Sequence, residues 1–169
     1  MVTMLRIFPA ETDDDVDWAK GLFFEYADFL KERFGDSVES DWAEQFRQRF
    51  EAEVDSLPGE YVAPKGCLLL AEYRGKKTGC VALRKVSEVV CEMRRLYVKR
   101  ELRGLGIGKA LVKAVIERAR ELGYHCMRLD TNRLLEAATG LYVSLGFEAV
   151  SPCEEILMEG MTRMELKLM

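Results

Sequence analysis

The chain is poor in the residues that build metal centres. Its 169 residues include one histidine, His125, and no two of its five cysteines form a Cys-x-x-Cys pair. The cysteines are Cys67, Cys80, Cys91, Cys126 and Cys153. Zinc sites need several such ligands at short spacings, so we expect no metal site and instead reduced, partly buried thiols.

Segments that direct a chain to a membrane or to export are also missing. No apolar run approaches the ~20 residues that span a bilayer, and residues 1–9 lack the basic and then apolar pattern of a signal peptide. The chain has no clustered basic stripe of the kind that binds nucleic acid. We therefore expect a cytoplasmic protein without membrane or nucleic-acid partners.

Internal repeats and low-complexity linkers are absent as well, and the composition is ordinary for a globular protein. Hydrophobic residues make up 49% of the chain and charged residues 32%, which argues against disorder. A length of 169 residues suits one domain with a sizeable core. We expect a single domain over residues 1–169.

What the chain does contain is a glycine-rich turn between an apolar strand and a helix. The strand Leu96-Tyr97-Val98 leads into Arg103-Gly104-Leu105-Gly106-Ile107-Gly108-Lys109. Glycines let backbone N–H groups approach a ligand closely, and a helix start offers four unpaired N–H groups with about half a positive charge. This combination predicts a phosphate-binding site, although a turn that merely caps the helix would use the same residues.

Two well-known phosphate loops do not fit. The P-loop requires Ser or Thr after Gly-Lys, whereas Ala110 follows Gly108-Lys109, so no hydroxyl is available for magnesium. The dinucleotide fingerprint Gly-x-Gly-x-x-Gly does not match glycines that are spaced evenly by two. The pattern that does fit is Arg-x-x-Gly-x-Gly, from Arg103 to Gly108.

This pattern resembles the pyrophosphate loop of the GCN5-related N-acetyltransferase (GNAT) superfamily. The resemblance extends to Glu92-Met93-Arg94-Arg95-Leu96-Tyr97-Val98 before the loop and to Leu141-Tyr142-Val143-Ser144-Leu145-Gly146-Phe147 after it. The three blocks stand in the family's order and cover about residues 66–150. The resemblance implies acetyl-CoA as co-substrate, with the backbone of residues 103–109 around the pyrophosphate. It places Leu96, Tyr97 and Val98 along the pantetheine arm.

Hydrophobic periodicity and turn residues predict the order of the elements. Strands are expected at 4–8, 67–73, 78–84, 89–98, 126–131, 147–150 and 162–168, and helices from Thr12 or Asp13 to Gly35, over 42–54, from the glycine turn to Gly123, and at about 134–145. Along the last strand apolar and charged residues alternate, so one face is expected to be buried and the other to face water. The buried face carries Met164, Leu166 and Leu168, and the face toward water carries Arg163, Glu165 and Lys167.

This order of elements matches the α/β (α+β) fold of the GNAT family. That fold is a mixed, mostly antiparallel sheet flanked by helices. Two of its parallel strands, here ending near Val98 and Thr131, splay apart at the cofactor cleft and admit the pantetheine arm.

Acetyl transfer to an amine requires a base. A lysine-like amine with a pKa near ~10.4 is almost fully protonated at pH 7 and must lose a proton before it attacks. Glu92 lies eleven residues before Arg103, the offset of the family's glutamate base, and is the candidate for this role, directly or through water. The other interpretation is a strand carboxylate paired with Arg94, because residues two apart on a strand share a face.

The reaction also requires a proton for the leaving thiolate and a donor for the carbonyl oxygen. Tyr142 matches the family's acid tyrosine, and a phenol with a pKa near ~10 is protonated at neutral pH. The other interpretation is a core tyrosine in register with Ala138 and Leu145. The resemblance assigns the oxyanion donor to the backbone N–H of Leu96. Glu92, Tyr142 and Leu96 are therefore the expected catalytic set.

One position departs from the family pattern. Many members carry Asn seven residues before the tyrosine, where this chain has Leu135, with Asn132 three residues earlier. Asn132 could cap the following helix instead of contacting the cofactor arm. His125 begins a strand far in sequence from any partner, so we expect it at the surface.

Charge is divided unevenly along the chain. Residues 1–65 carry 16 acidic and 7 basic side chains, and residues 66–169 carry 13 and 18. In the family the first two helices border the acceptor, and here they carry Asp28, Glu32, Asp36, Glu39, Asp41 and Glu44. We therefore expect a cationic acceptor, unless Arg94 or Arg95 projects into the cleft to bind a substrate carboxylate.

The function expected from these residues is that of an acetyl-CoA-dependent N-acetyltransferase acting on a primary amine of a small molecule or a peptide. A non-catalytic acyl-CoA-binding sensor or scaffold with the same fold is the alternative. Glu92 and Tyr142 together favour the enzyme. The protein is expected as a monomer or a homodimer.

Overall fold

The computed structural model describes residues 4–35, 40–132, 134–150 and 160–169, without the side chains of residues 40–43. The elements are β1 (Leu5–Pro9), α1 (Asp13–Phe34), α2 (Ser40–Ser56), β2 (Cys67–Tyr73), β3 (Lys76–Lys85), β4 (Val90–Val98), α3 (Ile107–Glu121), β5 (Cys126–Asn132), α4 (Glu136–Ser144), β6 (Glu148–Val150) and β7 (Met161–Lys167). Every strand and helix expected from the sequence is present, and its ends lie within two residues of the predicted ones.

The seven strands of the described residues form one sheet, in the order β1-β2-β3-β4-β5-β7-β6. Neighbouring strands are antiparallel except β4 and β5, which run parallel. The connection from β4 to β5 passes through α3, as a parallel pair requires. The predicted mixed, mostly antiparallel sheet flanked by helices is confirmed.

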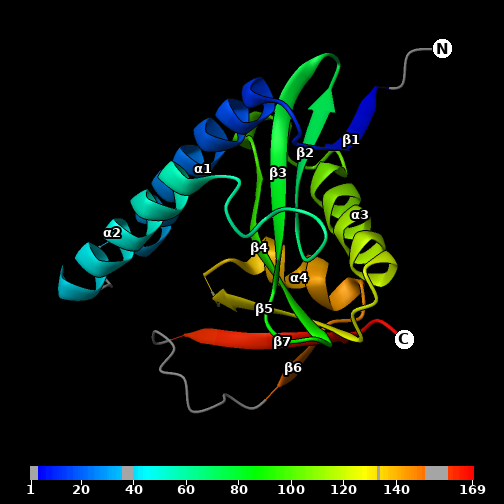
Figure 1. Ribbon diagram of the computed structural model, residues 1–169. Helices are drawn as coiled ribbons and strands as arrows, with labels where there is room; N and C mark the ends of the chain where they lie inside the picture. Colours follow the sequence, from blue (N-terminus) through cyan, green and yellow to red (C-terminus); the bar gives the residue numbers. More distant parts are fainter. Residues whose placement is uncertain (1–3, 36–39, 133, 151–159) are drawn as a thin grey trace.

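Helices cover both faces of the sheet (Figure 1). On one face a hydrophobic cluster joins α3 and α4 to the central strands, with Val81, Met93, Leu111, Val115 and Met127 among its members. On the other face α1 and α2 lie over a second cluster, which contains Phe23, Phe50, Leu68, Leu70, Cys80 and Ala82. Successive strand residues point to opposite faces, so β3 contributes to both clusters. None of the helices in the described part of the chain is long and apolar enough to cross a membrane.

α1 begins and ends at the residues that the sequence predicts. The Thr12 hydroxyl accepts the N–H of Asp15 at 3.1 Å, and the Asp15 carboxylate accepts the N–H of Thr12 at 3.3 Å, which is a capping box. Gly35 caps the other end with a φ of 46°, where a side chain would be strained. The helix that packs over β3 and β4 is thus capped at both ends.

The expected alternation along β7 is wrong at one position. Arg163 is 4% exposed instead of facing water. Its Nε and Nη2 donate to the Asp130 carboxylate of β5 at 2.8 and 3.1 Å. Because β7 lies between β5 and β6, this guanidinium is within reach of a cross-strand carboxylate, and pairing makes its burial tolerable.

β4 and β5 are paired over a short stretch only, Val90–Glu92 with Cys126–Arg128. Beyond it β5 continues along β7, and β4 continues along β3. Within the described part of the chain, the β5-facing edge of residues 93–98 therefore has no partner strand. This is the predicted splay between the two parallel strands.

Four cysteines lie in the described residues, and all are free thiols. Cys67, Cys80 and Cys91 are buried, and Cys126 is half-buried. Burial raises the pKa of the Cys67 thiol to about 11, so this thiol stays neutral at physiological pH. Cys153 lies outside the described residues.

Candidate active site

The glycine-rich loop lies between the end of β4 and the start of α3, and it is open. Gly104 and Gly106 have φ values of 83° and 84°, and a Cβ atom at either position would meet nothing within 4 Å. Gly106 is also the N-cap of α3, and no side chain caps this helix. The first N–H groups of α3 therefore border an open cradle that fits an anionic group.

Arg103, the first residue of the loop motif, turns toward α1. Its Nε donates to the carbonyl oxygen of Val98 at 3.0 Å. Its guanidinium lies 4.4 Å from the ring centroid of Phe29 and 5.5 Å from that of Tyr97. The side chain thus joins the loop to α1. That Arg103 also takes part in phosphate binding, through its backbone, stays a prediction. Lys109, in the first turn of α3, is exposed.

β4 contains a bulge at the splay. Its pairing with β3 shifts between Arg94 and Tyr97, so that Arg95 and Leu96 together oppose one residue of β3. Arg95 has a φ of 59°, which is uncommon for a residue with a side chain. A bulge takes a residue out of the ladder and re-aims the local backbone. No glycine or proline marks it, so the sequence does not predict it.

Tyr142 lies on α4 with its ring in the core. It is 7% exposed, and its ring centroid is 5.8 Å from that of Phe147. The same cluster includes Val98 of β4 and Leu129 of β5, from the two strands that flank the splay. Burial, together with the Tyr26 phenol, raises the pKa of Tyr142, so its phenol keeps the proton. The ring thus belongs to the core, and a role of the hydroxyl as a proton donor stays a prediction.

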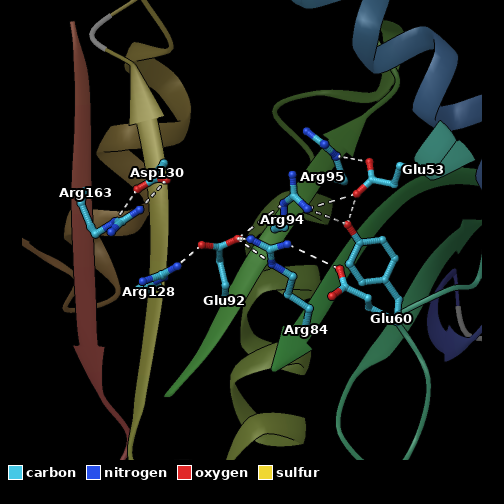
Figure 2. Close-up of polar contacts among 10 residues, drawn as sticks. Glu53, Glu60, Arg84, Glu92, Arg94, Arg95, Arg128, Asp130 and Arg163 are labelled. Atoms are coloured by element: carbon cyan, nitrogen blue, oxygen red, sulfur yellow. Dashed lines mark hydrogen bonds and ion pairs between the residues drawn. The ribbon is translucent and has the colours of Figure 1, made fainter. Parts of the chain in front are cut away.

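Glu92 is held by arginines from three strands (Figure 2). Arg84 of β3 lies 2.9 Å from Oε1, and Arg128 of β5 donates its Nε to Oε2 at 3.0 Å. Arg94, the partner expected from the sequence, lies 3.5 Å from Oε1. Glu92 is 5% exposed. Both carboxylate oxygens are engaged, so a proton can reach Glu92 only at an oxygen that also faces an arginine.

Arg84 and Arg128 are site residues that sequence reasoning misses. They are the register partners of Glu92 on its two neighbouring strands. Arg128 is 36 residues away in the chain. The strand order and register bring the two arginines to Glu92, and no local motif signals either of them.

A pocket of about 560 Å³ opens beside this cluster, and we call it the arginine pocket. It lies between the C-terminal half of α2, the segment 57–61, and the strands β3 and β4. Its charged lining consists of Arg49, Arg84, Arg94, Arg95, Glu53 and Glu60. Arg94 and Arg95 therefore border a cleft. The sequence favours an acceptor that carries a carboxylate if one of these two arginines lies in a cleft.

Two of the acidic residues behind the expectation of a cationic acceptor have basic partners. Glu32 pairs with Arg100 at 2.5 Å, and Glu44 pairs with Arg47 at 2.5 Å. Asp28 is exposed. The side chains of Asp36, Glu39 and Asp41 lie outside the described residues. Basic neighbours thus offset part of the acidic charge on which this expectation depends.

Asn132 shapes the turn into α4. Its Oδ1 accepts the N–H of Leu134 at 2.9 Å, and Leu135 is the N-cap of α4. Asn132 thus makes a local bond before α4 and does not cap this helix, a role that the sequence leaves open. His125, just before β5, is exposed as expected. Across the described ranges, no group of three His, Cys, Asp or Glu side chains could hold a metal ion.

Known sequences match most of the chain. The profile of the acetyltransferase (GNAT) family matches residues 26–147. An uncharacterized N-acetyltransferase of Schizosaccharomyces pombe is 40% identical over 107 residues, which are 62% of this chain and 66% of that protein. The N-acetylaspartate synthetase of Danio rerio is 38% identical over 117 residues, which are 68% of this chain and 42% of that protein. The chain thus spans less than two thirds of the length of these two relatives.

Solved structures share the fold. The structure of a putative acetyltransferase from Salmonella typhimurium with its cofactor acetyl-CoA has a TM-score of 0.68. The match covers 98% of this chain and 95% of that one, at 22% sequence identity. At this identity the comparison shows a common fold, with the same sheet and flanking helices along nearly the whole chain.

Proposed function

The chain belongs to the acetyltransferase (GNAT) family, and on this premise we propose that it is an acyltransferase that moves an acetyl group from acetyl-CoA to a primary amine of a small molecule or a peptide. The observation that carries the proposal is the splay between β4 and β5, which leads to an open glycine loop at the start of α3. The acetyl-CoA bound to the Salmonella typhimurium protein of the same fold supports the choice of donor.

The residues around the splay fit acetyl-CoA, which supplies the acyl group as a reactive thioester. The backbone N–H groups of residues 104–109 would hold the pyrophosphate, because the loop is open and α3 has no side-chain cap. The edge of β4 at Tyr97 and Val98 would hold the pantetheine arm as an added strand, since it has no partner strand in the described chain.

Leu96 is assigned as the oxyanion donor through its backbone N–H. The bulge at Arg95 and Leu96 re-aims the backbone at the splay, which supports this assignment. A preorganised N–H stabilises the negative charge that develops on the carbonyl oxygen during acyl transfer. The side chain of Leu96 has no part in this role.

Tyr142 is assigned as the acid that gives a proton to the leaving thiolate. A phenol is protonated at neutral pH and so has a proton to give, and burial keeps the Tyr142 phenol neutral. Tyr142 belongs to the hydrophobic cluster that also contains Val98 of β4 and Leu129 of β5, the two strands that splay apart, which supports the assignment.

Glu92 is assigned as the group that receives the proton of the amine. Each carboxylate oxygen has two lone pairs, so an oxygen that accepts from an arginine can still accept from a water. We therefore assign transfer through water and not by direct contact with the amine. The arginines around Glu92 hold the carboxylate in one orientation.

The acceptor is assigned at this stage only as a primary amine. The acidic first 65 residues favour a cation, whereas the arginine pocket favours an anion. The name of the Danio rerio relative gives N-acetylaspartate as the product of that protein. An acceptor screen therefore has to contain amines of both charges.

Thiol release from acetyl-CoA in the presence of single amines tests the proposal. The panel contains spermidine, lysine, aspartate, glutamate, and one basic and one acidic peptide, and mass spectrometry identifies an acetylated product. We expect release with at least one amine and none in the Gly106→Asp variant. Binding of acetyl-CoA without release for any amine would contradict the enzyme and favour the acyl-CoA-binding sensor or scaffold.

A further inference from the structure

The arginine pocket has an excess of positive charge beside the transfer site. Four arginines and two glutamates line it. We propose that this pocket binds a carboxylate of the acceptor and thereby selects an anionic amine, such as an acidic amino acid. The identity of the ligand as an acceptor rests on the proposed function, whereas carboxylate binding is a property of the pocket itself.

The two glutamates of the pocket serve as counter-ions for its arginines. Glu53 accepts from Arg94 at Oε1 and from Arg95 at Oε2, at 3.2 and 2.8 Å (Figure 2). Glu60 lies 3.4 Å from Arg84. Both oxygens of Glu53 are therefore occupied within the protein. These contacts hold the guanidinium groups in place. Glu92 also pairs with Arg84 and Arg94, so the four arginines face three carboxylates and still keep a net positive charge for a ligand.

Arg49 and Arg94 keep N–H groups that a ligand could use. Within the described residues Arg49 forms no ion pair or hydrogen bond, although it lines the pocket. Arg94 uses Nη1 toward Glu53 and Tyr61 and its Nε toward Glu92, but Nη2 has no partner among the described residues. The Arg94 side chain is 25% exposed, so a small molecule can reach it. A guanidinium fork suits the planar carboxylate better than an ammonium group does.

The pocket borders the strand segment at which we place the transfer site. Arg94 and Arg95 of its lining come directly before Leu96 on β4, the residue to which we assign the oxyanion donor. A ligand carboxylate at Arg94 would therefore lie next to this segment.

A cationic amine would be repelled at the same place. Its ammonium group would approach four guanidinium groups, and the acidic groups there are already paired with them. A pocket with an excess of one sign of charge concentrates ligands of the other sign and slows the binding of ligands of its own sign. The pocket thus reverses the preference expected from the overall charge of the first two helices.

Thermal unfolding with glutarate, a dicarboxylate without an amine, measures carboxylate binding apart from any reaction. For the full chain with acetyl-CoA present, we expect the midpoint to rise with glutarate concentration and the rise to shrink in high salt. Putrescine at equal ionic strength provides the cationic comparison and should produce no rise.

Arg49→Gln is the preferred variant, because it breaks no ion pair among the described residues. We expect it to remove the glutarate effect and to raise the KM for glutamate about tenfold or more, while kcat and the KM for acetyl-CoA stay unchanged. Arg94→Gln should act in the same direction. Arg47→Gln is the matched control, since Arg47 lies on the same helix but pairs with Glu44 and Glu51 outside the pocket.

The outcomes separate this inference from the proposed function. Acetylation of spermidine without any effect of glutarate or glutamate would overturn the anionic acceptor and leave the acetyltransferase intact. A glutarate effect that Arg49→Gln abolishes, without acetylation of any amine, would support the carboxylate site and overturn the proposed function. Equal glutarate stabilisation of the wild type and Arg49→Gln would overturn the assignment of the pocket.

Discussion

Arg95 donates its Nε to Oε2 of Glu53 at 2.8 Å and so joins the bulge of β4 to α2. The Arg95 guanidinium also lies 5.1 Å from the ring centroid of Phe50, and the side chain is 11% exposed. α2 therefore supports the strand segment to which we assign the oxyanion donor. The same helix supplies Arg49 and Glu53 to the arginine pocket. The contact between Arg95 and Glu53 therefore links this pocket to the β4 segment with the assigned oxyanion donor.

Gly106→Asp should abolish the stabilisation of the protein by acetyl-CoA. The substitution adds a side chain and a negative charge at the N-cap of α3, where we expect phosphate. Thermal unfolding over a range of acetyl-CoA concentrations measures the effect. Gly123→Asp is the control, because Gly123 also has a positive φ and an open surface but lies beyond the other end of α3. Equal shifts in both variants would contradict the phosphate site.

Leu96→Pro should lower kcat by about 10²-fold or more, because it removes the N–H assigned to the carbonyl oxygen. Leu96→Val keeps this N–H and should retain a kcat near that of the wild type. Circular dichroism of both variants checks that the sheet is intact. A proline variant that is folded and fully active would show that the donor is another group.

Tyr142→Phe should lower kcat by about 10²-fold while the affinity for acetyl-CoA is kept, since only a proton donor is lost. The raised pKa of Tyr142 means that its phenol does not ionise below its ordinary value near ~10. A decline of the rate at alkaline pH below that value must therefore come from another group and persist in the variant. An unchanged kcat would reduce Tyr142 to a core residue.

Glu92→Gln should depress the rate most at low pH, where the acceptor amine is mainly protonated and needs a base. It should also lower the free energy of unfolding by about 3 kcal/mol, because it leaves arginines on three strands without their carboxylate. Urea unfolding measures the second effect. A loss of stability with an unchanged pH–rate profile would make Glu92 a counter-ion of the arginines and not a base.

The parts of the structure that local sequence determines are predicted well. β2 occupies the predicted residues because an apolar run ends at a turn, and Thr12 and Gly35 mark the ends of α1 through their own chemistry. The glycine loop and the start of α3 also follow from local pattern. Their proposed roles in binding remain predictions.

The parts that depend on strand order and register are not predictable in this way. Arg84 and Arg128 reach Glu92 only because β3 and β5 flank β4 at a particular register. Arg163 is buried because β7 enters the sheet beside β5 and not at an edge. The bulge at Arg95 and the arginine pocket likewise arise from contacts between segments far apart in the chain. Periodicity within one segment contains no information on these neighbours.

The contact between Arg103 and Phe29 has a consequence for how the two substrates affect each other. It joins the glycine loop to α1, and Phe23 of α1 packs against Phe50 of α2 with ring centroids 6.3 Å apart. Phe29 packs against the same hydrophobic cluster as Phe23 and Phe50, so packed side chains connect the loop with the helix that lines the arginine pocket. We expect acetyl-CoA and the acceptor each to bind more tightly when the other is bound.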